Sequence, residues 1–283
     1  MEKINYNDSD LKELEQLKNN AKIYDEAKQK SAKRNRVIVI AVFFVSLLVF
    51  LYLRVFNTHF EMVDDNGIRV KYSTAWFINV PAEYEGKKIE YAEKIWEPVE
   101  APYLLFLTFE EGIQRVGGSN SNTLMAVQFP STITDIHDDA FYKAKNLRWV
   151  SLPNQVDSLE IGKWAFQGTA IREIILPEGV TGVGKGAFYG CDNLEKAEFP
   201  DTVTYMGEGM FAYCGKLKMV KLPNSYEVLP DRFFEDCYGL KEVIWPSDLK
   251  AIFYSTWNAS EILPEGVHDL IPEGVIFEKK KDN

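Results

Sequence analysis

The sequence predicts a repeat solenoid with a parallel β-sheet on one face and short helices or turns on the other, preceded by a single transmembrane α-helix. Three observations predict it: prolines recur with a fixed spacing, a phenylalanine column recurs with them, and one long apolar run precedes both. The prolines are separated by 23, 24, 23, 23 and 23 residues, at Pro130, Pro153, Pro177, Pro200, Pro223 and Pro246. Such a period is typical of stacked repeats, each of which buries its apolar side only against its neighbours.

The apolar run, residues 37–55, reads VIVIAVFFVSLLVFLYLRV and carries a single charge, Arg54, at its edge. As a helix it spans about 28 Å, close to the hydrocarbon thickness of a bilayer. A cleaved signal peptide is the alternative, but residues 1–36 precede the run and Asn57-Thr-His-Phe-Glu offers no small-x-small cleavage site. We therefore expect a transmembrane signal anchor.

The flanking charges predict the orientation of this span. Lysine and arginine crowd its N-terminal side, at Lys22, Lys28, Lys30, Lys33, Arg34 and Arg36. Because positive charge is retained in the cytoplasm, residues 1–36 are expected inside and the remainder outside, as in a type II single-pass protein of the cell membrane.

Residues 1–36 form a basic amphipathic segment, with Leu11, Leu14, Leu17, Ala21 and Tyr24 at helical spacing. One interpretation is a membrane-proximal helix whose basic end attracts anionic headgroups. The other is a short dimerising coiled coil, so the oligomeric state stays open.

Each repeat reads L-x-x-V-x-L-P followed by V-x-x-I-x-x-x-A-F-x-x-C. The alternation in its first half predicts one short strand with one buried side, and the proline, which has no N–H to donate, ends that strand. In the second half, Gly162, Gly184 and Gly207 precede a short Ala-Phe segment. We expect these glycines to make turns, and the segment to form a turn or two of helix on the convex back.

Two stretches, EGVTGVGKGAFYGCDNLEKAEFP and DTVTYMGEGMFAYCGKLKMVKLP, resemble the BspA-type leucine-rich repeats of bacterial cell-surface proteins. The resemblance implies a leucine-rich-repeat solenoid over residues 109–246. Residues 57–108 are expected to be a juxtamembrane β-rich region with a divergent first repeat around Pro81, although a small independent β domain would look alike. Residues 247–283 are expected to be a degenerate C-terminal cap and tail.

Two further columns are expected to be structural. The first is aromatic and comprises Phe141, Phe166, Phe188, Phe211 and Phe234. The second holds the three cysteines, Cys191, Cys214 and Cys237, one repeat apart. Identical solenoid positions favour a ladder of buried thiols over a disulfide, and a linear ladder supplies no converging ligands for a metal.

Composition and motifs exclude several functions. The formal net charge is −10, and the predicted outer part is more acidic still, which argues against nucleic acid and anionic polymers as partners. His59, His137 and His268 lie in unrelated segments, and the acidic neighbours of His137 are expected to cap a turn. No G-x-S-x-G, H-E-x-x-H or phosphate loop occurs. We expect no enzyme, no metal and no cofactor.

The candidate ligand-binding residues project from the concave side of the predicted sheet. Four are apolar and four are charged: Trp149, Ile175, Met219, Ile244, Glu173, Lys196, Glu198 and Lys221. Glu173 is expected to pair with Lys196, and Glu198 with Lys221. Apolar residues on a polar sheet mark a contact patch, although packing among neighbours explains them nearly as well. Tyr142, Tyr189, Tyr213 and Tyr238 are expected on the convex edge as an alternative contact stripe.

These observations predict a membrane-anchored extracellular protein that binds a protein or glycan without catalysis. The resemblance implies adhesion or host interaction. A short tether to the membrane suggests the alternative, a scaffold or sensor that binds a partner in the same membrane or wall, and an envelope enzyme is the third hypothesis.

Overall fold

The computed structural model describes residues 58–73, 75–93, 104–118, 121–224, 226–247, 249–254 and 276–279. The predicted cytoplasmic segment 1–36 and membrane span 37–55 lie outside these residues, as does most of the predicted cap. Among the residues that are described, no helix is long and apolar enough to cross a membrane.

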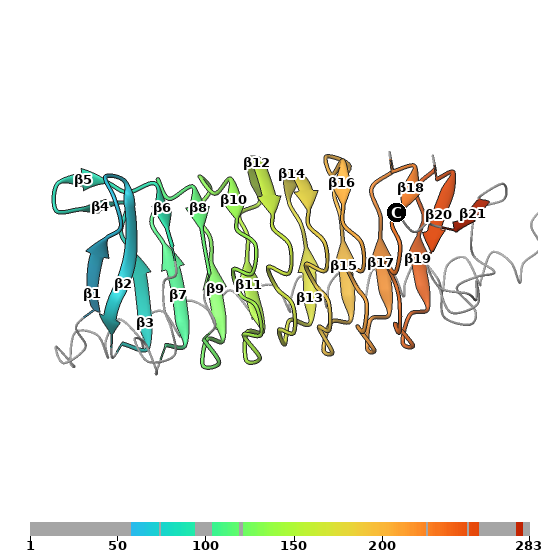
Figure 1. The fold of residues 1–283 in the computed structure, drawn as a ribbon, viewed down its shortest axis with the longest axis horizontal. Coiled ribbons are helices and arrows are strands. Elements are labelled where there is room, and N and C mark those ends of the chain that lie inside the picture. The colour runs from blue at the N-terminus through green and yellow to red at the C-terminus, as the bar shows by residue number, and fades with distance from the viewer. Residues whose placement is uncertain are drawn as a thin grey trace, which may run out of the picture. The chain divides into compact units, whose positions relative to one another are not determined.

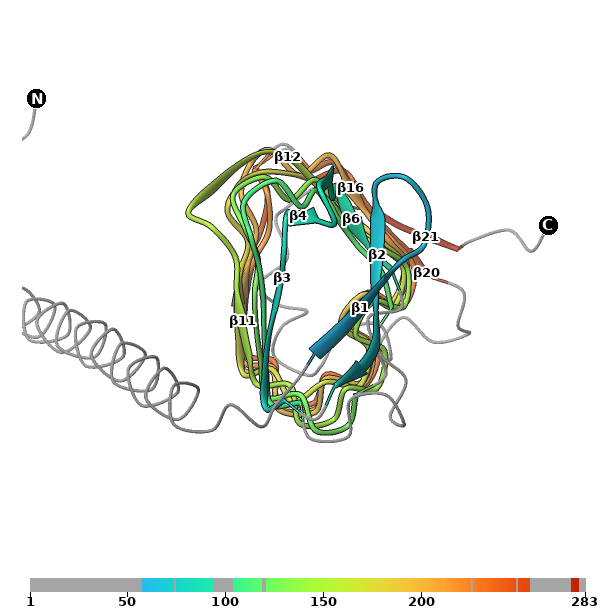
Figure 2. The ribbon, with the colours of Figure 1, turned by 90° about the vertical axis from the view of Figure 1, so that its left-hand side faces the viewer.

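The described residues form a stack of coils, each of which contributes two short strands to two different sheets (Figure 1). Viewed along the stack, β3 and β11 lie on one side of the coil and β2 and β6 on the other, with the core between them (Figure 2). The strand that ends before the proline therefore faces a second strand of the same coil across the core.

The strands on the proline side form two four-stranded parallel sheets. The first has the order β11-β9-β7-β3 and comprises β3 (Phe77–Val80), β7 (Phe106–Phe109), β9 (Ala126–Gln128) and β11 (Trp149–Ser151). The second comprises β13 (Glu173–Ile175), β15 (Lys196–Glu198), β17 (Met219–Lys221) and β19 (Glu242–Ile244). Their solvent-facing side chains are called the candidate face below.

The opposite side carries an eight-stranded sheet of order β1-β2-β6-β8-β10-β12-β14-β16. Its strands are β1 (Thr58–Met62), β2 (Gly67–Ser73), β6 (Tyr91–Ala92), β8 (Arg115–Val116), β10 (Asp135–Ile136), β12 (Gln155–Ile161), β14 (Glu178–Val183) and β16 (Tyr205–Met206). A largely parallel sheet thus lies on each side, where the sequence had predicted one sheet and a helical or turned back.

The turn segments that follow this sheet contain no helix within the described residues, which corrects the expected helical turns. In each repeat the residues two before and two after the phenylalanine have positive φ, as at Asp139 (59°) and Lys143 (56°) around Phe141. The Ala140 N–H donates to the His137 carbonyl (3.2 Å) and the Ala144 N–H to the Phe141 carbonyl (3.1 Å). This is the type II turn pattern, and left-handed residues four apart prevent a helix from continuing.

Residues upstream of the clear repeats continue both sheets. β2 pairs in parallel with β6, β6 with β8, and β3 with β7. β1 pairs antiparallel with β2 at the end of the eight-stranded sheet, and β4 (Glu83–Tyr84) and β5 (Lys87–Lys88) form a small hairpin. The β strands of this region therefore share the core of the repeats.

At the other end, β18 (Val228–Leu229), β20 (Ala251–Tyr254) and β21 (Ile276–Lys279) form a three-stranded parallel sheet in that order. Residues 276–279 thus continue the parallel strand pairing beyond Pro246, the last of the regularly spaced prolines.

The core is built around the phenylalanine column. The rings of Phe141, Phe166, Phe188 and Phe211 stack nearly parallel, with centroids 5.4, 5.6 and 5.8 Å apart, and Phe234 follows at 6.1 Å. All five are fully or almost fully buried. Each aromatic contact of this kind is worth about 1 kcal/mol beyond its area burial, so the column links the five coils that contribute a phenylalanine to it.

Gly162, Gly184 and Gly207 each directly precede a turn, and the Gly162 and Gly184 carbonyls accept the turn hydrogen bonds from the N–H groups of Ala165 (3.4 Å) and Ala187 (3.2 Å). None of the three has a positive φ. A Cβ built on Gly184 would lie 2.5 Å from the backbone nitrogen of Lys163, and one on Gly207 would lie 2.2 Å from that of Lys185. These glycines let the backbones of successive coils approach closely.

The two sheets on the proline side are separated between β11 and β13. The turn that leads to β13 is one residue short, because five positions separate Phe166 from Ile171 whereas six separate Phe188 from Leu194. The Ala170 N–H accordingly donates to the carbonyl of Leu147 (2.9 Å). This local change of register interrupts the ladder between Trp149 and Glu173.

Candidate functional site

Strand register arranges the candidate face into two columns over β13, β15, β17 and β19. Glu173, Lys196, Met219 and Glu242 are successive partners in the first, and Ile175, Glu198, Lys221 and Ile244 in the second. Side chains directly opposite one another on a sheet lie about 5 Å apart, so each column is a continuous row of contacts.

Lys196 is the electrostatic centre of these columns. Its Nζ lies 3.2 Å from the Glu173 carboxylate and also forms a close ion pair with Glu198. Partial burial opposes the charge, but the hydrogen bonds to Glu198 and Glu173 outweigh it and raise the pKa of Lys196. Within the described residues no ion pair joins Glu198 to Lys221. The expected Glu173 and Lys196 pair is present, and Glu198 pairs along its own strand instead.

The apolar members of the candidate face do not form one patch. Ile175 and Ile244 occupy the two ends of one column, with Glu198 and Lys221 between them. Met219 is half-buried, and its neighbours in the column are Lys196 and Glu242. None of these three apolar residues therefore adjoins another of them within its column.

Trp149 is the fourth apolar residue of the candidate face. It is 57% exposed and Ile175 is 52% exposed, and they lie on β11 and β13, the strands that flank the interruption between the two sheets. The two most exposed apolar side chains of the candidate face thus lie on either side of the interruption between the two sheets, next to the short turn before β13.

The three thiols lie inside the stack, behind the phenylalanine column. Cys191, Cys214 and Cys237 are free and buried, and each Sγ donates to the carbonyl oxygen of a phenylalanine in the preceding coil, at 3.1, 3.1 and 3.0 Å. Burial raises the pKa of Cys191 to about 11 and that of Cys237 to about 12. The ladder is structural and presents no accessible nucleophile.

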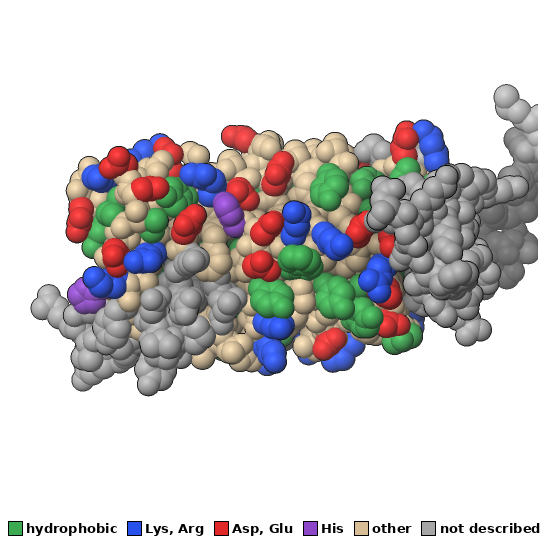
Figure 3. Space-filling model, in the orientation of Figure 1, with side chains coloured by type: hydrophobic (Ala, Val, Ile, Leu, Met, Phe, Trp, Pro, Cys, Tyr) green, Lys and Arg blue, Asp and Glu red, His purple; other side chains and the backbone are tan. Residues whose placement is uncertain are grey.

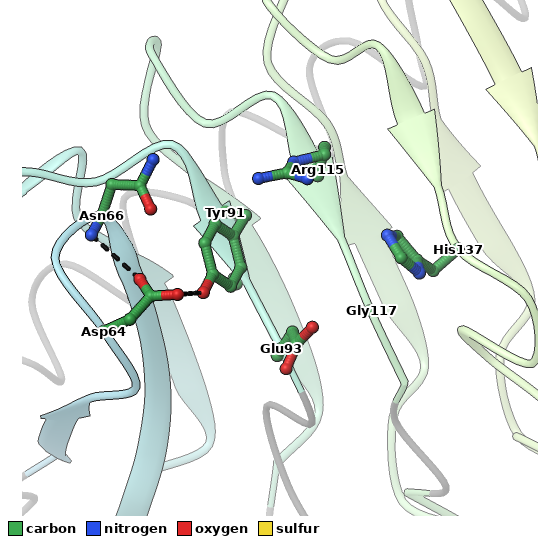
Figure 4. A pocket seen from close by; sticks show the side chains of 8 residues that line it. Asp64, Asn66, Tyr91, Glu93, Arg115, Gly117 and His137 are labelled. Carbon is green, nitrogen blue, oxygen red and sulfur yellow. Dashed lines mark hydrogen bonds between the residues drawn. The ribbon is translucent and has the colours of Figure 1, made fainter.

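A shallow polar pocket of about 280 Å³ lies on the outer side of the eight-stranded sheet (Figure 4). The Tyr91 hydroxyl donates to the Asp64 carboxylate, and the Arg115 guanidinium lies 4.8 Å from the centroid of the Tyr91 ring. The hydrogen bond lowers the pKa of Asp64 and raises that of Tyr91 to about 12. Glu93 completes the lining on this side, so acidic groups outnumber the single cation and disfavour an anionic ligand.

Sequence reasoning missed this pocket because it assigned no strand to the second half of the repeat. Tyr91, Arg115 and Asp135 are register partners on β6, β8 and β10. The sequence did contain a signal for the pocket. Each of these three residues directly precedes a buried apolar residue of the second strand, and the alternation of side chains along a strand places it on the solvent side.

His137 borders the pocket, and its Nε2 lies 3.2 Å from the Asp135 carboxylate. Burial raises the pKa of Asp135, with the charge of Glu160 adding to the effect and that of His137 opposing it. The Asp138 carboxylate accepts a hydrogen bond from the Lys163 backbone N–H (2.6 Å). Within the described residues, no group of three or more histidine, cysteine or acidic side chains is arranged to hold a metal ion.

Comparison with known proteins bears on the repeats. The model of the BspA type leucine rich repeat region matches six copies over residues 113–241. No curated protein sequence matches the chain. Proteins with leucine-rich repeats are typically protein-binding and generally non-catalytic scaffolds.

Two solved structures share the fold. A leucine-rich repeat protein from Bacteroides ovatus is 24% identical, with a TM-score of 0.56, over 70% of this chain and 53% of its own. This chain therefore spans about half the length of that protein. The T. pallidum leucine rich repeat protein is 19% identical, with a TM-score of 0.50, over 78% of this chain and 95% of its own. Together with the repeat columns and the stacked coils, these matches identify residues 113–241 as a BspA-type leucine-rich repeat region.

Proposed function

We propose that this chain is a membrane-anchored extracellular protein that binds a protein or glycan partner through the candidate face, in adhesion to other cells or to host material. The observation that carries this proposal is the exposure of Trp149 and Ile175 on either side of the sheet interruption. Large apolar side chains surrounded by charged ones are typical of the centre of an interface.

The surrounding charges suit such an interface. Glu173 and Lys196 lie beside the apolar pair and are already joined by an ion pair at the surface. Exposed pairs contribute about 0–1 kcal/mol to stability, so their larger effect is on partner choice, because a mismatched charge opposite them is costly.

Photo-crosslinking in living cells tests the proposal. A photoreactive residue at Trp149 or Ile175 is expected to capture a molecule from added host matrix material, whereas the same residue at Tyr205 is not. Tyr205 is a matched control because it is 56% exposed and lies on β16 of the opposite sheet. Equal capture from Tyr205, or no specific capture from either position on the candidate face, would contradict the proposal.

One observation favours a second function, a scaffold or sensor of the cell's own envelope. The first strand begins at Thr58, three residues after the end of the predicted span at Val55. A tether of this length reaches on the order of 10 Å, which favours partners in the same membrane or wall. The same experiment separates the two functions, since capture of an envelope protein of the same cell from Trp149 supports the scaffold.

A further inference from the structure

A notch of about 390 Å³ opens on the turn segments between the eight-stranded sheet and the candidate face. Three successive coils line it, and the side chains that bear on its chemistry are Lys143, Lys145, Gln167, Tyr189, Asp192 and Asn193. In the middle coil, the turn from Phe166 to Ile171 is one residue shorter than those of the coils before and after it. This turn lies between the lysines of the coil before it and Tyr189 of the coil after it.

Aromatic rings continue the surface of the notch. The Tyr189 ring lies 5.1 Å from that of Tyr213, and Trp164 lies over Gly186, where an added Cβ would come within 2.5 Å of the indole ring and 3.5 Å of the Tyr189 Cβ. Trp164 and Tyr213 are 38% and 40% exposed. Figure 3 shows hydrophobic side chains gathered on the lower part of this side of the molecule, beside lysine and arginine side chains. We call Trp164, Tyr189 and Tyr213 the aromatic platform.

Two platform residues occupy backbone positions that favour glycine. Trp164 has a φ of 53° and Tyr213 a φ of 63°, whereas Gly186 and Gly190 fill the equivalent positions in the coil between them. A non-glycine residue in this region is strained. Asp139, Lys143, Arg232 and Asp236 have the same positive φ at equivalent turn positions, so these positions accept non-glycine residues, and two of them here present partly exposed aromatic rings beside the notch.

The polar groups define what the platform binds. Asn193 accepts a hydrogen bond from the Lys216 Nζ (2.8 Å) through its Oδ1, which fixes the amide and leaves its Nδ2 group to donate. The Lys143 ammonium is held 4.8 Å from the centroid of the Tyr142 ring. Within the described residues, neither Lys143 nor Lys145 makes an ion pair. Flat rings beside amide, carboxylate and ammonium groups match a ligand with an apolar ring face, hydroxyl groups and a negative charge.

We propose that the notch and the aromatic platform bind a short oligosaccharide that carries a carboxylate. The sugar ring lies on the platform, its hydroxyl groups bond with Gln167, Asp192 and Asn193, and its carboxylate faces Lys143 and Lys145. The acidic solenoid repels a long polyanion, but at physiological salt the repulsion is screened beyond about 8 Å, so a short oligosaccharide is accepted. This site does not depend on what the candidate face binds.

The test uses the full chain in detergent on an array in which each short oligosaccharide bearing a uronic or sialic acid has a neutral counterpart of the same linkage. The strongest acidic binder is then titrated against variants by calorimetry. Trp164→Gly is expected to weaken binding at least tenfold, because it removes one ring of the aromatic platform, and glycine fits the turn because Gly186 holds the equivalent position in the next coil. The double variant Lys143→Met and Lys145→Met is expected to abolish the preference for the acidic member.

Tyr205→Ala is the matched control, since it removes an exposed aromatic ring from β16, outside both the notch and the candidate face, and is expected to leave oligosaccharide binding unchanged. Loss of host-material capture from Trp149 with intact oligosaccharide binding would count against the proposed function alone. No binding anywhere on the array, or unchanged binding by Trp164→Gly, would overturn the oligosaccharide site. Equal binding of neutral and acidic members would overturn the role of the two lysines.

Discussion

The Sγ atom of Cys214 lies 3.1 Å from the carbonyl oxygen of Phe188, so each thiol of the cysteine column donates to the coil before it. The donor and the acceptor are 26 residues apart in the chain. The thiol ladder and the phenylalanine column therefore join the same neighbouring coils, one through hydrogen bonds and the other through stacked rings.

The buried thiols predict alkaline sensitivity. Burial raises the pKa of Cys191 to about 11 and of Cys237 to about 12, so the folded protein keeps both thiols protonated where the unfolded chain ionises them. This contribution to stability is complete below about pH 8.5, the ordinary thiol pKa, and is lost as the pH rises toward 12. Urea unfolding at pH 7 and pH 10 measures it, and the loss is expected to be smaller in Cys191→Ala. An equal loss in that variant would contradict the assignment.

The left-handed turn positions predict opposite effects of two similar substitutions. Gly190 has a φ of 63° and Gly215 has no positive φ, and an added Cβ at either meets nothing within 4 Å. Gly190→Ala is expected to lower the free energy of unfolding by about 1 kcal/mol from backbone strain alone. Gly215→Ala is expected to raise it by about 0.5 kcal/mol, because alanine reduces the conformational entropy of the unfolded chain. Denaturant midpoints measure both, and equal effects would show that the turn geometry does not decide them.

The close approach of successive coils predicts a larger cost at Gly207. An added Cβ there would lie 2.2 Å from the backbone nitrogen of Lys185, which cannot move without shifting the coil. Gly207→Ala is expected to destabilise by about 3 kcal/mol. The control is Gly182→Ala, where the nearest atoms lie at 3.9 Å, an ordinary contact distance. A Gly207→Ala protein as stable as the Gly182→Ala protein would refute the close-packing argument.

Asp135 is expected to make the folded state less stable as the pH rises, which is opposite to the effect of most carboxylates. Burial and the charge of Glu160 raise its pKa, so the folded state is favoured while the carboxyl is protonated and loses that advantage as the pH rises through the folded pKa. Asp135→Asn is therefore expected to be more stable than the wild type at pH 7.5, by less than about 1 kcal/mol because the group is partly exposed. The difference in unfolding free energy at pH 3 is the control and is expected to be smaller.

The sequence determined the repeat, because the stacking of coils requires the same residue type at the same position of every coil. The proline and phenylalanine columns were sufficient for the parallel strands, the aromatic core and the buried thiols. The columns did not distinguish the two uses of glycine, since Gly207 meets a backbone that is distant in sequence whereas Gly190 has an intrinsic left-handed φ.

Only the tertiary structure decided the rest. Half of the strands of the second sheet have only two residues, such as Asp135–Ile136, whose stability comes from pairing with other coils and leaves little local periodicity. The sheet interruption beside Trp149 and the notch beside Tyr189 both adjoin the turn between Phe166 and Ile171, which is one residue short. The missing residue is visible in the sequence, but its consequence depends on which groups the neighbouring coils bring to the gap.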